Sequence, residues 1–130
     1  MSLSQGTSKY ILKSSLQLKD FVELLLEPLR EYQRLYQIKL GLHEALVNAA
    51  KHGNKLDPEK VITVRRIITP NWCVWQIQDQ GIGLDIKKRV FKLPNNIDSV
   101  NGRGLFIIHE CFDDVRWSPK GNRLQLALKI

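Results

Sequence analysis

The sequence predicts an α+β two-layer sandwich, in which helices cover one face of a mostly antiparallel sheet. Apolar residues repeat at helical spacing between residues 16 and 52 and again after residue 104. Other stretches are rich in β-branched and alternating residues, and short turn signals separate them into pairs. The 130 residues are 43% hydrophobic and 25% charged, which are ordinary values for one globular domain.

The first half of the chain predicts one strand and two helices. Residues 1–8 predict a flexible lead-in, and residues 9–13 are rich in β-formers and predict a first strand. A broad apolar stripe after residue 15 predicts a helix, which Pro28 interrupts because its ring does not fit a helix interior. Helical spacing returns over residues 34–52, and Gly53 provides a C-terminal stop.

The second half predicts two hairpins around a third helix. Residues 60–69 and 72–79 predict paired strands on either side of a Pro-Asn turn. A basic polar stretch leads to glycines followed by helix-formers, which predicts a loop entering a helix at residues 101–105. Two closing strands join through a turn at residues 119–122. The predicted elements follow one another in the order strand, helix, helix, strand, strand, loop, helix, strand, strand. This order predicts that the helices lie on one face of the sheet.

Composition narrows the function classes. No apolar run approaches the roughly 18 residues that a membrane span requires, and the start of the chain lacks the apolar centre of a secretory signal. Cys73 and Cys111 stand far apart and outside any metal-binding pattern, so we interpret them as small buried apolar residues. We therefore expect a cytoplasmic protein.

The net charge of +7 requires an anionic partner to be considered. Nucleic acid, an acidic protein surface and a phosphorylated small molecule are the candidates. Lys and Arg are scattered, with short clusters at residues 65–66 and 87–89 and no long basic run. This distribution weakens the nucleic-acid interpretation and does not choose between the other two.

Three polar residues recur at steps of four in an otherwise apolar helix. Glu44, Asn48 and His52 share one face because this spacing stacks side chains a turn apart. Such stripes usually face solvent. Here the neighbouring residues are nearly all small or aliphatic, so a carboxylate needs a partner, a cavity or a ligand. An Asn oxygen can coordinate Mg²⁺, and a Glu one turn away can accept a proton.

A glycine-containing segment, DQGIG, follows the second predicted hairpin strand. Asp79 stands at the strand end, and Gly81 and Gly83 lack the side chains that would keep a flat ligand away from the backbone. The same segment is explained equally well by a glycine-rich turn in which the Asp79 side chain hydrogen-bonds to nearby backbone.

The segment NGRGL opens the third predicted helix. Gly102 and Gly104 would expose backbone N–H groups where the helix dipole favours an anion, and Arg103 adds a cation that suits phosphate. A loop with an exposed Arg is the competing interpretation.

Together and in this order, ExxxNAxxHG, DxGxG and GRGL resemble the N box and the two glycine boxes of the GHKL ATPases, the Bergerat-fold family. The short DQGIGLD and the closing GNRLQLALKI are most similar to the bacterial branch of anti-sigma-factor serine/threonine kinases. The resemblance covers residues 9–130 and implies one ATP-binding domain with the Bergerat fold.

The resemblance assigns roles to individual positions. Asn48 matches the Asn that coordinates Mg²⁺, and Glu44 matches the residue treated as the general base. Asp79 matches the carboxylate that accepts the adenine amino group, and Gly81 and Gly83 give the base room.

The phosphate end of the site corresponds to the second glycine box. Gly102, Arg103 and Gly104 match the turn around the phosphates, and His52 takes a supporting role in nucleotide binding. Residues 87–101 correspond to the ATP lid, whose basic residues either complement the triphosphate or simply form a solvated loop. His43 replaces a small polar residue that is common in this branch, with no assigned consequence.

The function that the resemblance implies is that of an ATP-dependent protein serine/threonine kinase. Such a kinase binds ATP and Mg²⁺, phosphorylates a STAS-type anti-anti-sigma protein, and regulates transcription by sequestering a sigma factor in another state. Relatives in this branch often pair, and the sequence leaves open whether this chain forms a homodimer. Two alternatives stay open: a non-catalytic, nucleotide-gated protein-binding module, and a histidine-kinase-like ATPase domain. Glu44 favours the kinase, because a module that only binds needs no base.

Overall fold

A five-stranded antiparallel sheet forms one layer of the molecule. The computed structural model describes residues 5–13, 18–82 and 100–130, with the backbone alone for residues 100–103. The strand order is β1-β2-β3-β5-β4, and every neighbouring pair is antiparallel. The strands are β1 (Gly6–Lys13), β2 (Val61–Ile68), β3 (Trp72–Gln78), β4 (Asp114–Trp117) and β5 (Arg123–Lys129).

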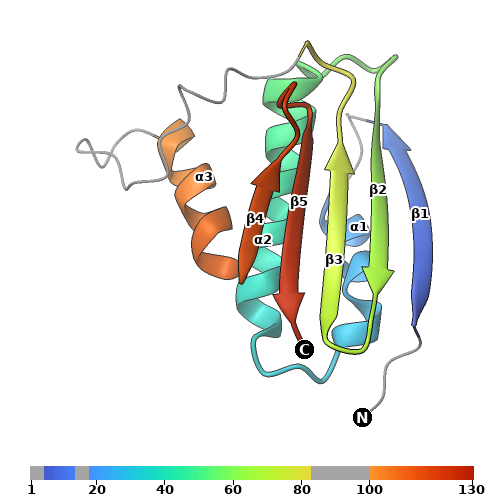
Figure 1. Ribbon diagram of the computed structural model, residues 1–130. Coiled ribbons are helices and arrows are strands. Elements are labelled where there is room, and N and C mark those ends of the chain that lie inside the picture. The colour runs from blue at the N-terminus through green and yellow to red at the C-terminus, as the bar shows by residue number, and fades with distance from the viewer. Residues whose placement is uncertain (1–4, 14–17, 83–99) are drawn as a thin grey trace.

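The helices form the second layer, on one face of the sheet. Figure 1 shows α1 and α2 behind the strands and α3 beside α2 next to β4. The helices are α1 (Leu18–Leu25), α2 (Leu35–Asn48) and α3 (Val100–Cys111), with a 3₁₀ turn at Glu27–Leu29 and a π-helical continuation of α2 at Ala49–Gly53. The arrangement confirms the predicted α+β sandwich. Within the described ranges, no helix combines the length and the apolarity needed to cross a bilayer.

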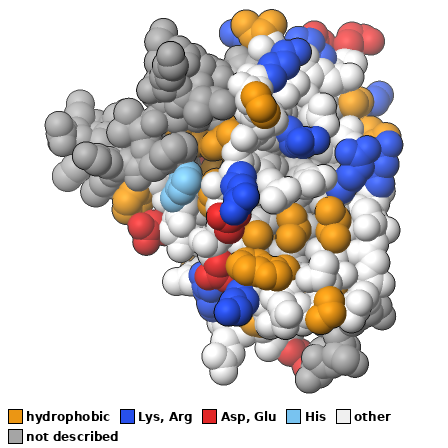
Figure 2. All heavy atoms as spheres, in the orientation of Figure 1, with side chains coloured by type: hydrophobic (Ala, Val, Ile, Leu, Met, Phe, Trp, Pro, Cys, Tyr) orange, Lys and Arg blue, Asp and Glu red, His pale blue; other side chains and the backbone are white. Residues whose placement is uncertain are grey.

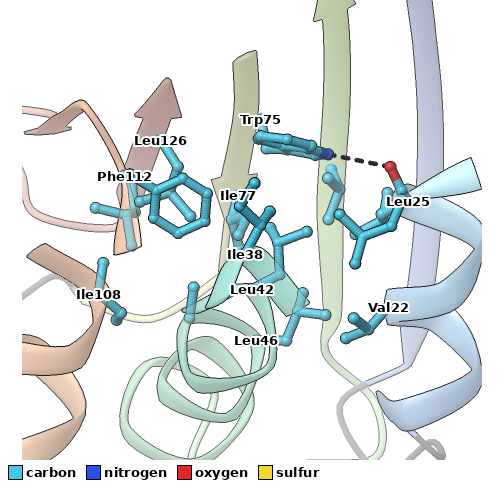
Figure 3. Close-up of a cluster of buried hydrophobic side chains, with 14 of the residues drawn as sticks. Val22, Leu25, Ile38, Leu42, Leu46, Trp75, Ile77, Ile108, Phe112 and Leu126 are labelled. Atoms are coloured by element: carbon cyan, nitrogen blue, oxygen red, sulfur yellow. Dashed lines mark hydrogen bonds between the residues drawn. The ribbon is translucent and has the colours of Figure 1, made fainter. Parts of the chain in front are cut away.

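The core lies between α2 and the sheet. Ile38, Leu42 and Leu46 of α2 are completely buried against side chains of β3 and β5, such as Ile77 and Leu126 (Figure 3). The indole N–H of Trp75 donates a hydrogen bond to the carbonyl of Leu25 at 3.3 Å, so the largest core side chain also binds the end of α1. Cys73 and Cys111 are buried, as predicted, and burial raises the pKa of Cys73 to about 12.

Gly41 lets α3 approach α2 closely. A Cβ at this position would lie 2.7 Å from both Cys111 Cβ and Phe112 Cε2. Such contacts do not occur in folded proteins, so any side chain would push the helices apart. This close approach matters because α2 and α3 carry two of the three predicted polar clusters.

The first strand begins earlier than its sequence predicts. β1 starts at Gly6 rather than at residue 9, because it pairs with the whole of β2, from Gly6 opposite Ile68 to Lys13 opposite Val61. Local β-propensity does not reveal how far an edge strand follows its partner. Residues 1–4 of the predicted lead-in lie outside the described ranges.

The Arg65-Arg66 cluster is divided between the two faces of the sheet. Arg66 points toward the helices, where its Nη1 donates to the carbonyls of Leu24 (3.2 Å) and Leu25 (3.3 Å) at the end of α1. Its guanidinium also lies 5.5 Å from the ring centroid of Tyr10, within cation–π range. Arg66 therefore caps a helix, and strand alternation places only Arg65 on the open face of the sheet. Figure 2 shows this open face, with Lys and Arg side chains in blue.

The start of α2 is held by a carboxylate clamp. Arg34 donates from Nη1 to Asp113 Oδ1 at 3.1 Å and from Nη2 to the Cys111 carbonyl at 3.2 Å. The backbone N–H of Lys129 donates to Asp113 Oδ2 at 2.7 Å. The Lys129 N–H, and then Arg34, hold the pKa of Asp113 below its ordinary value of 3.8. The clamp connects α2 to the ends of α3 and β5.

We predict that Arg66→Met lowers the free energy of unfolding by about 2 kcal/mol, because two carbonyls at the end of α1 lose a charged donor. Arg65→Met is the matched control on the opposite face and should change it by less than about 0.5 kcal/mol. Urea unfolding followed by tryptophan fluorescence measures both. Equal losses in the two variants would contradict the capping role.

We predict that Asp113→Asn lowers stability by about 1 kcal/mol at neutral pH, a value reduced for the partial exposure of the pair. Because folding lowers this pKa, the carboxylate contributes its full stability above pH 3.8 and loses it as the pH falls through the lower folded value. The difference between wild type and variant should therefore disappear in acid. Urea unfolding at pH 7, 4 and 2.5 measures it, and a constant difference would contradict the clamp.

Candidate functional site

The polar stripe lies along the C-terminal half of α2 and its π-helical continuation. Glu44 and Asn48 are half-buried on the α-helical part, and His52 is exposed in the π-helical turn. In that turn the N–H of Asn54 donates to the Ala49 carbonyl at 2.8 Å, five residues back. π-Helical turns often occur at functional sites. The structure thus brings Glu44 and Asn48 together and leaves His52 in solvent.

Asp79 is packed between two glycines. It follows β3 directly and is only 9% exposed, and its Oδ1 accepts the N–H of Gly81 at 2.8 Å. A Cβ on Gly53 would overlap the Asp79 carboxylate, and a Cβ on Gly81 would overlap the Gly53 carbonyl. The end of α2 therefore touches the loop after β3 with no space for a side chain. The sequence interpreted Gly53 as a helix stop and as the last residue of the N-box motif, and this contact gives a packing reason for a glycine at that position.

Asn54 is a site residue that the sequence did not reveal. It is completely buried, its Nδ2 donates to the Val61 carbonyl at 2.9 Å, and its Oδ1 accepts the N–H of Gln80 at 2.6 Å. In return Gln80 Oε1 accepts the N–H of Val61 at 2.8 Å. Asn54 thereby joins the end of α2, the start of β2 and the loop that carries Asp79. Its partners are 7 and 26 residues away, so no local pattern distinguishes it from an ordinary turn residue.

The second glycine box meets the stripe at Glu44. A Cβ on Gly104 would lie 3.2 Å from Glu44 Oε2, so the start of α3 lies directly against this carboxylate. The helix begins at Val100, earlier than predicted, and therefore includes Gly102 and Gly104. Packing of α3 against α2 outweighs the low helix propensity of the glycines.

Anion binding at the start of α3 stays a prediction, and it now concerns residues before Gly104. The first four N–H groups of a helix, here those of residues 100–103, have no carbonyl partner within the helix and favour an anion. The side chain of Arg103, the position of Gly83 and most of the predicted lid, residues 87–101, lie outside the described ranges.

The described residues form a candidate site with two chemically different ends. Asp79, Gly53 and Gly81 form one end, and Glu44, Asn48 and the start of α3 form the other. Nine positions separate Glu44 from Gly53, which corresponds to roughly 13 Å along a helix axis. The arrangement suits an elongated ligand with a flat hydrogen-bond donor at one end and an anion at the other.

We predict that Asn54→Ala lowers the free energy of unfolding by about 2–3 kcal/mol, because the Val61 carbonyl and the Gln80 N–H both lose their partner in a buried place. Lys51→Ala, an exposed substitution in the same π-helical turn, should change it by less than about 0.5 kcal/mol. Denaturant titration tests both. A loss below 1 kcal/mol in Asn54→Ala would show that these hydrogen bonds do not hold the site together.

Comparisons with known proteins identify a family that matches most of the chain. Residues 20–128 match the family described as "Histidine kinase-like ATPase domain". The chain is 27% identical over 92 residues to proteins named "Serine-protein kinase RsbW" from Listeria monocytogenes serovar 1/2a, Listeria monocytogenes serotype 4a and Listeria innocua serovar 6a. Each match covers 65% of this chain and 59% of the relative, so the similarity spans about three fifths of those kinases.

The family match extends over most of the chain, and the antiparallel sheet with helices on one face is the fold that the family predicts. The motif order, the fold and the match therefore give one answer: the chain belongs to the family of histidine kinase-like ATPase domains, the GHKL or Bergerat-fold group.

Proposed function

We propose that the protein is an ATP-dependent serine/threonine protein kinase that phosphorylates a STAS-type anti-anti-sigma protein. The observation that carries this proposal is the packing of Gly104 against Glu44, because it puts a carboxylate beside an anion-favouring helix start. The similarity to proteins named serine-protein kinases supports the same reaction class.

Asp79 would recognise the adenine end of ATP. Its carboxylate is oriented by the Gly81 N–H, and the glycines on both sides hold it in place without a side chain between them. A carboxylate accepts hydrogen bonds only, so it suits the amino group of adenine and disfavours the carbonyl that guanine presents. Asn54 would act indirectly, by fixing the loop that carries Asp79.

Asn48 and the start of α3 would bind the phosphate end. The Asn48 amide oxygen is a suitable Mg²⁺ ligand, and the free N–H groups at residues 100–103 suit phosphate oxygens. The half-buried position of Asn48, one turn from Glu44, fits a metal that keeps several waters. Bound Mg²⁺ would neutralise the charge that develops on the transferred phosphoryl group.

Glu44 would act as the general base. Its carboxylate would take the proton of the attacking serine or threonine hydroxyl while the hydroxyl oxygen bonds to the γ-phosphorus. The bond between the γ-phosphorus and the bridging oxygen breaks, and ADP leaves with that oxygen. The remaining acceleration would come from orienting the two reactants and from charge neutralisation.

The regulatory role is proposed from the similarity to the kinases. We propose that the unphosphorylated STAS protein and a sigma factor compete for this protein, so that phosphorylation switches partners and alters transcription. This role requires a cytoplasmic protein, and pairing into a homodimer would double the partner sites.

We predict that Glu44→Ala leaves the Kd for Mg-ATP within about twofold and lowers the rate of phosphoryl transfer by about 10²–10⁴-fold, the usual contribution of a general base. Glu110→Ala, an exposed substitution on α3, is the control and should retain both properties. Calorimetry measures ATP binding, and labelled ATP with purified STAS proteins from the source genome measures transfer.

Two outcomes would contradict parts of the proposal. Undiminished phosphorylation by Glu44→Ala would remove the base assignment. Wild-type protein that binds ATP, leaves it intact and labels no STAS protein would favour the nucleotide-gated binding module instead.

A further inference from the structure

An apolar groove lies between α1 and α2 on the outer side of the helical layer. Its volume is about 200 Å³, smaller than the roughly 300–1,000 Å³ of sites that enclose small molecules. The groove therefore has the size for one or two protruding side chains. It is lined by Lys19 and Val22 of α1 and by Tyr36, Lys39, Leu40 and His43 of α2.

The walls of the groove are large apolar side chains that the described residues leave uncovered. Tyr36 is 83% exposed and Leu40 is 43% exposed, one helical turn apart on α2. Val22, which is 1% exposed, forms the floor. The opposite side of α2 supplies the core, so the first half of α2 carries exposed apolar side chains on a second face. Surface helices normally have one apolar face, and a second one indicates an interaction surface.

The rim of the groove carries an excess of positive charge. Lys39 pairs with Glu23, the acidic residue of α1 that stands beside the groove. Among the described residues, no salt bridge involves Lys19 or His43. An occupant that brings carboxylates would therefore find in Lys19 a cation that forms no salt bridge within the described residues, and in His43 a side chain that can donate a hydrogen bond.

We propose that this groove docks a segment of a partner protein that presents an apolar side chain flanked by carboxylates. The apolar side chain would lie over Val22 between Tyr36 and Leu40, and the carboxylates would pair with Lys19 and accept a hydrogen bond from His43. A nucleic acid fits poorly, because the walls are aliphatic or phenolic and Glu23 would repel phosphate.

The groove is adjacent in sequence to the candidate base. Tyr36 and Leu40 stand two turns and one turn before Glu44 on the same stripe of α2, so the groove and the candidate site follow one another along the helix. A docked partner would lie beside the site without filling it. The proposal rests on the proposed function only in requiring a protein partner, and it needs neither ATP binding nor phosphoryl transfer.

The test uses two helical peptides of equal length as probes. One alternates Leu and Glu along one face, and the other has every Glu replaced by Lys. We expect the acidic peptide to cause saturable ¹⁵N chemical-shift changes at the groove residues, and the basic peptide to bind at least about tenfold more weakly. Lys19→Glu should weaken the acidic peptide about tenfold. Lys120→Glu, an exposed control with the same charge change in the β4–β5 turn, should not.

Equal binding of the two peptides, shifts confined to the open face of the sheet, or no groove shifts at millimolar acidic peptide would overturn the proposal. Tyr36→Ala separates packing from charge, because it should weaken the acidic peptide without altering the preference for acidic over basic. Calorimetry with Mg-ATP on the same samples keeps the two proposals apart. Protein that binds ATP and not the peptide contradicts the groove alone, and the reverse result contradicts the nucleotide site alone.

Discussion

The contact between the backbone of Gly53 and the carboxylate of Asp79 constrains the candidate site more than any other interaction. No Cβ fits between them, so the end of α2 and the loop after β3 are in direct contact, and neither can shift without moving the other. Asn54 then fixes this pair to β2 through the Val61 carbonyl and the Gln80 N–H. Because these bonds are buried, releasing one end would leave unsatisfied polar groups, so the three segments form one cooperative unit.

Helix α2 transmits this constraint across the molecule, since a helix is stiff and its two ends are both held. At its start, Arg34 binds Asp113 and the Cys111 carbonyl. In its middle, Gly41 admits α3, which brings Gly104 against Glu44. The two ends of the site are thus placed relative to each other by one rigid element, which is the precision that a two-ended ligand requires.

Local periodicity was sufficient to predict the elements, and the features it missed depend on distant partners. The helical and alternating patterns predicted α1, α2 and the hairpins, because each pattern reflects burial on one face. β1 extends to Gly6 because β2 is long enough to pair with it, and α3 begins at Val100 because it packs on α2. The motif order predicted that Asp79 and Gly81 belong to one site, whereas the burial of Asn54 depends on residues that only the fold brings near.

The structure also shows that the positively charged residues of the chain have different roles. Arg66 caps α1 and Arg34 clamps α2, so part of the excess stabilises the fold and needs no external anion. Lys19 remains at the rim of an apolar groove, where its charge acts together with Tyr36 and Leu40. A cation beside exposed apolar side chains selects for an acidic protein segment, whereas phosphate backbones need charge without apolar surface. Where the cations lie, rather than their sum, therefore decides which class of partner the surface fits.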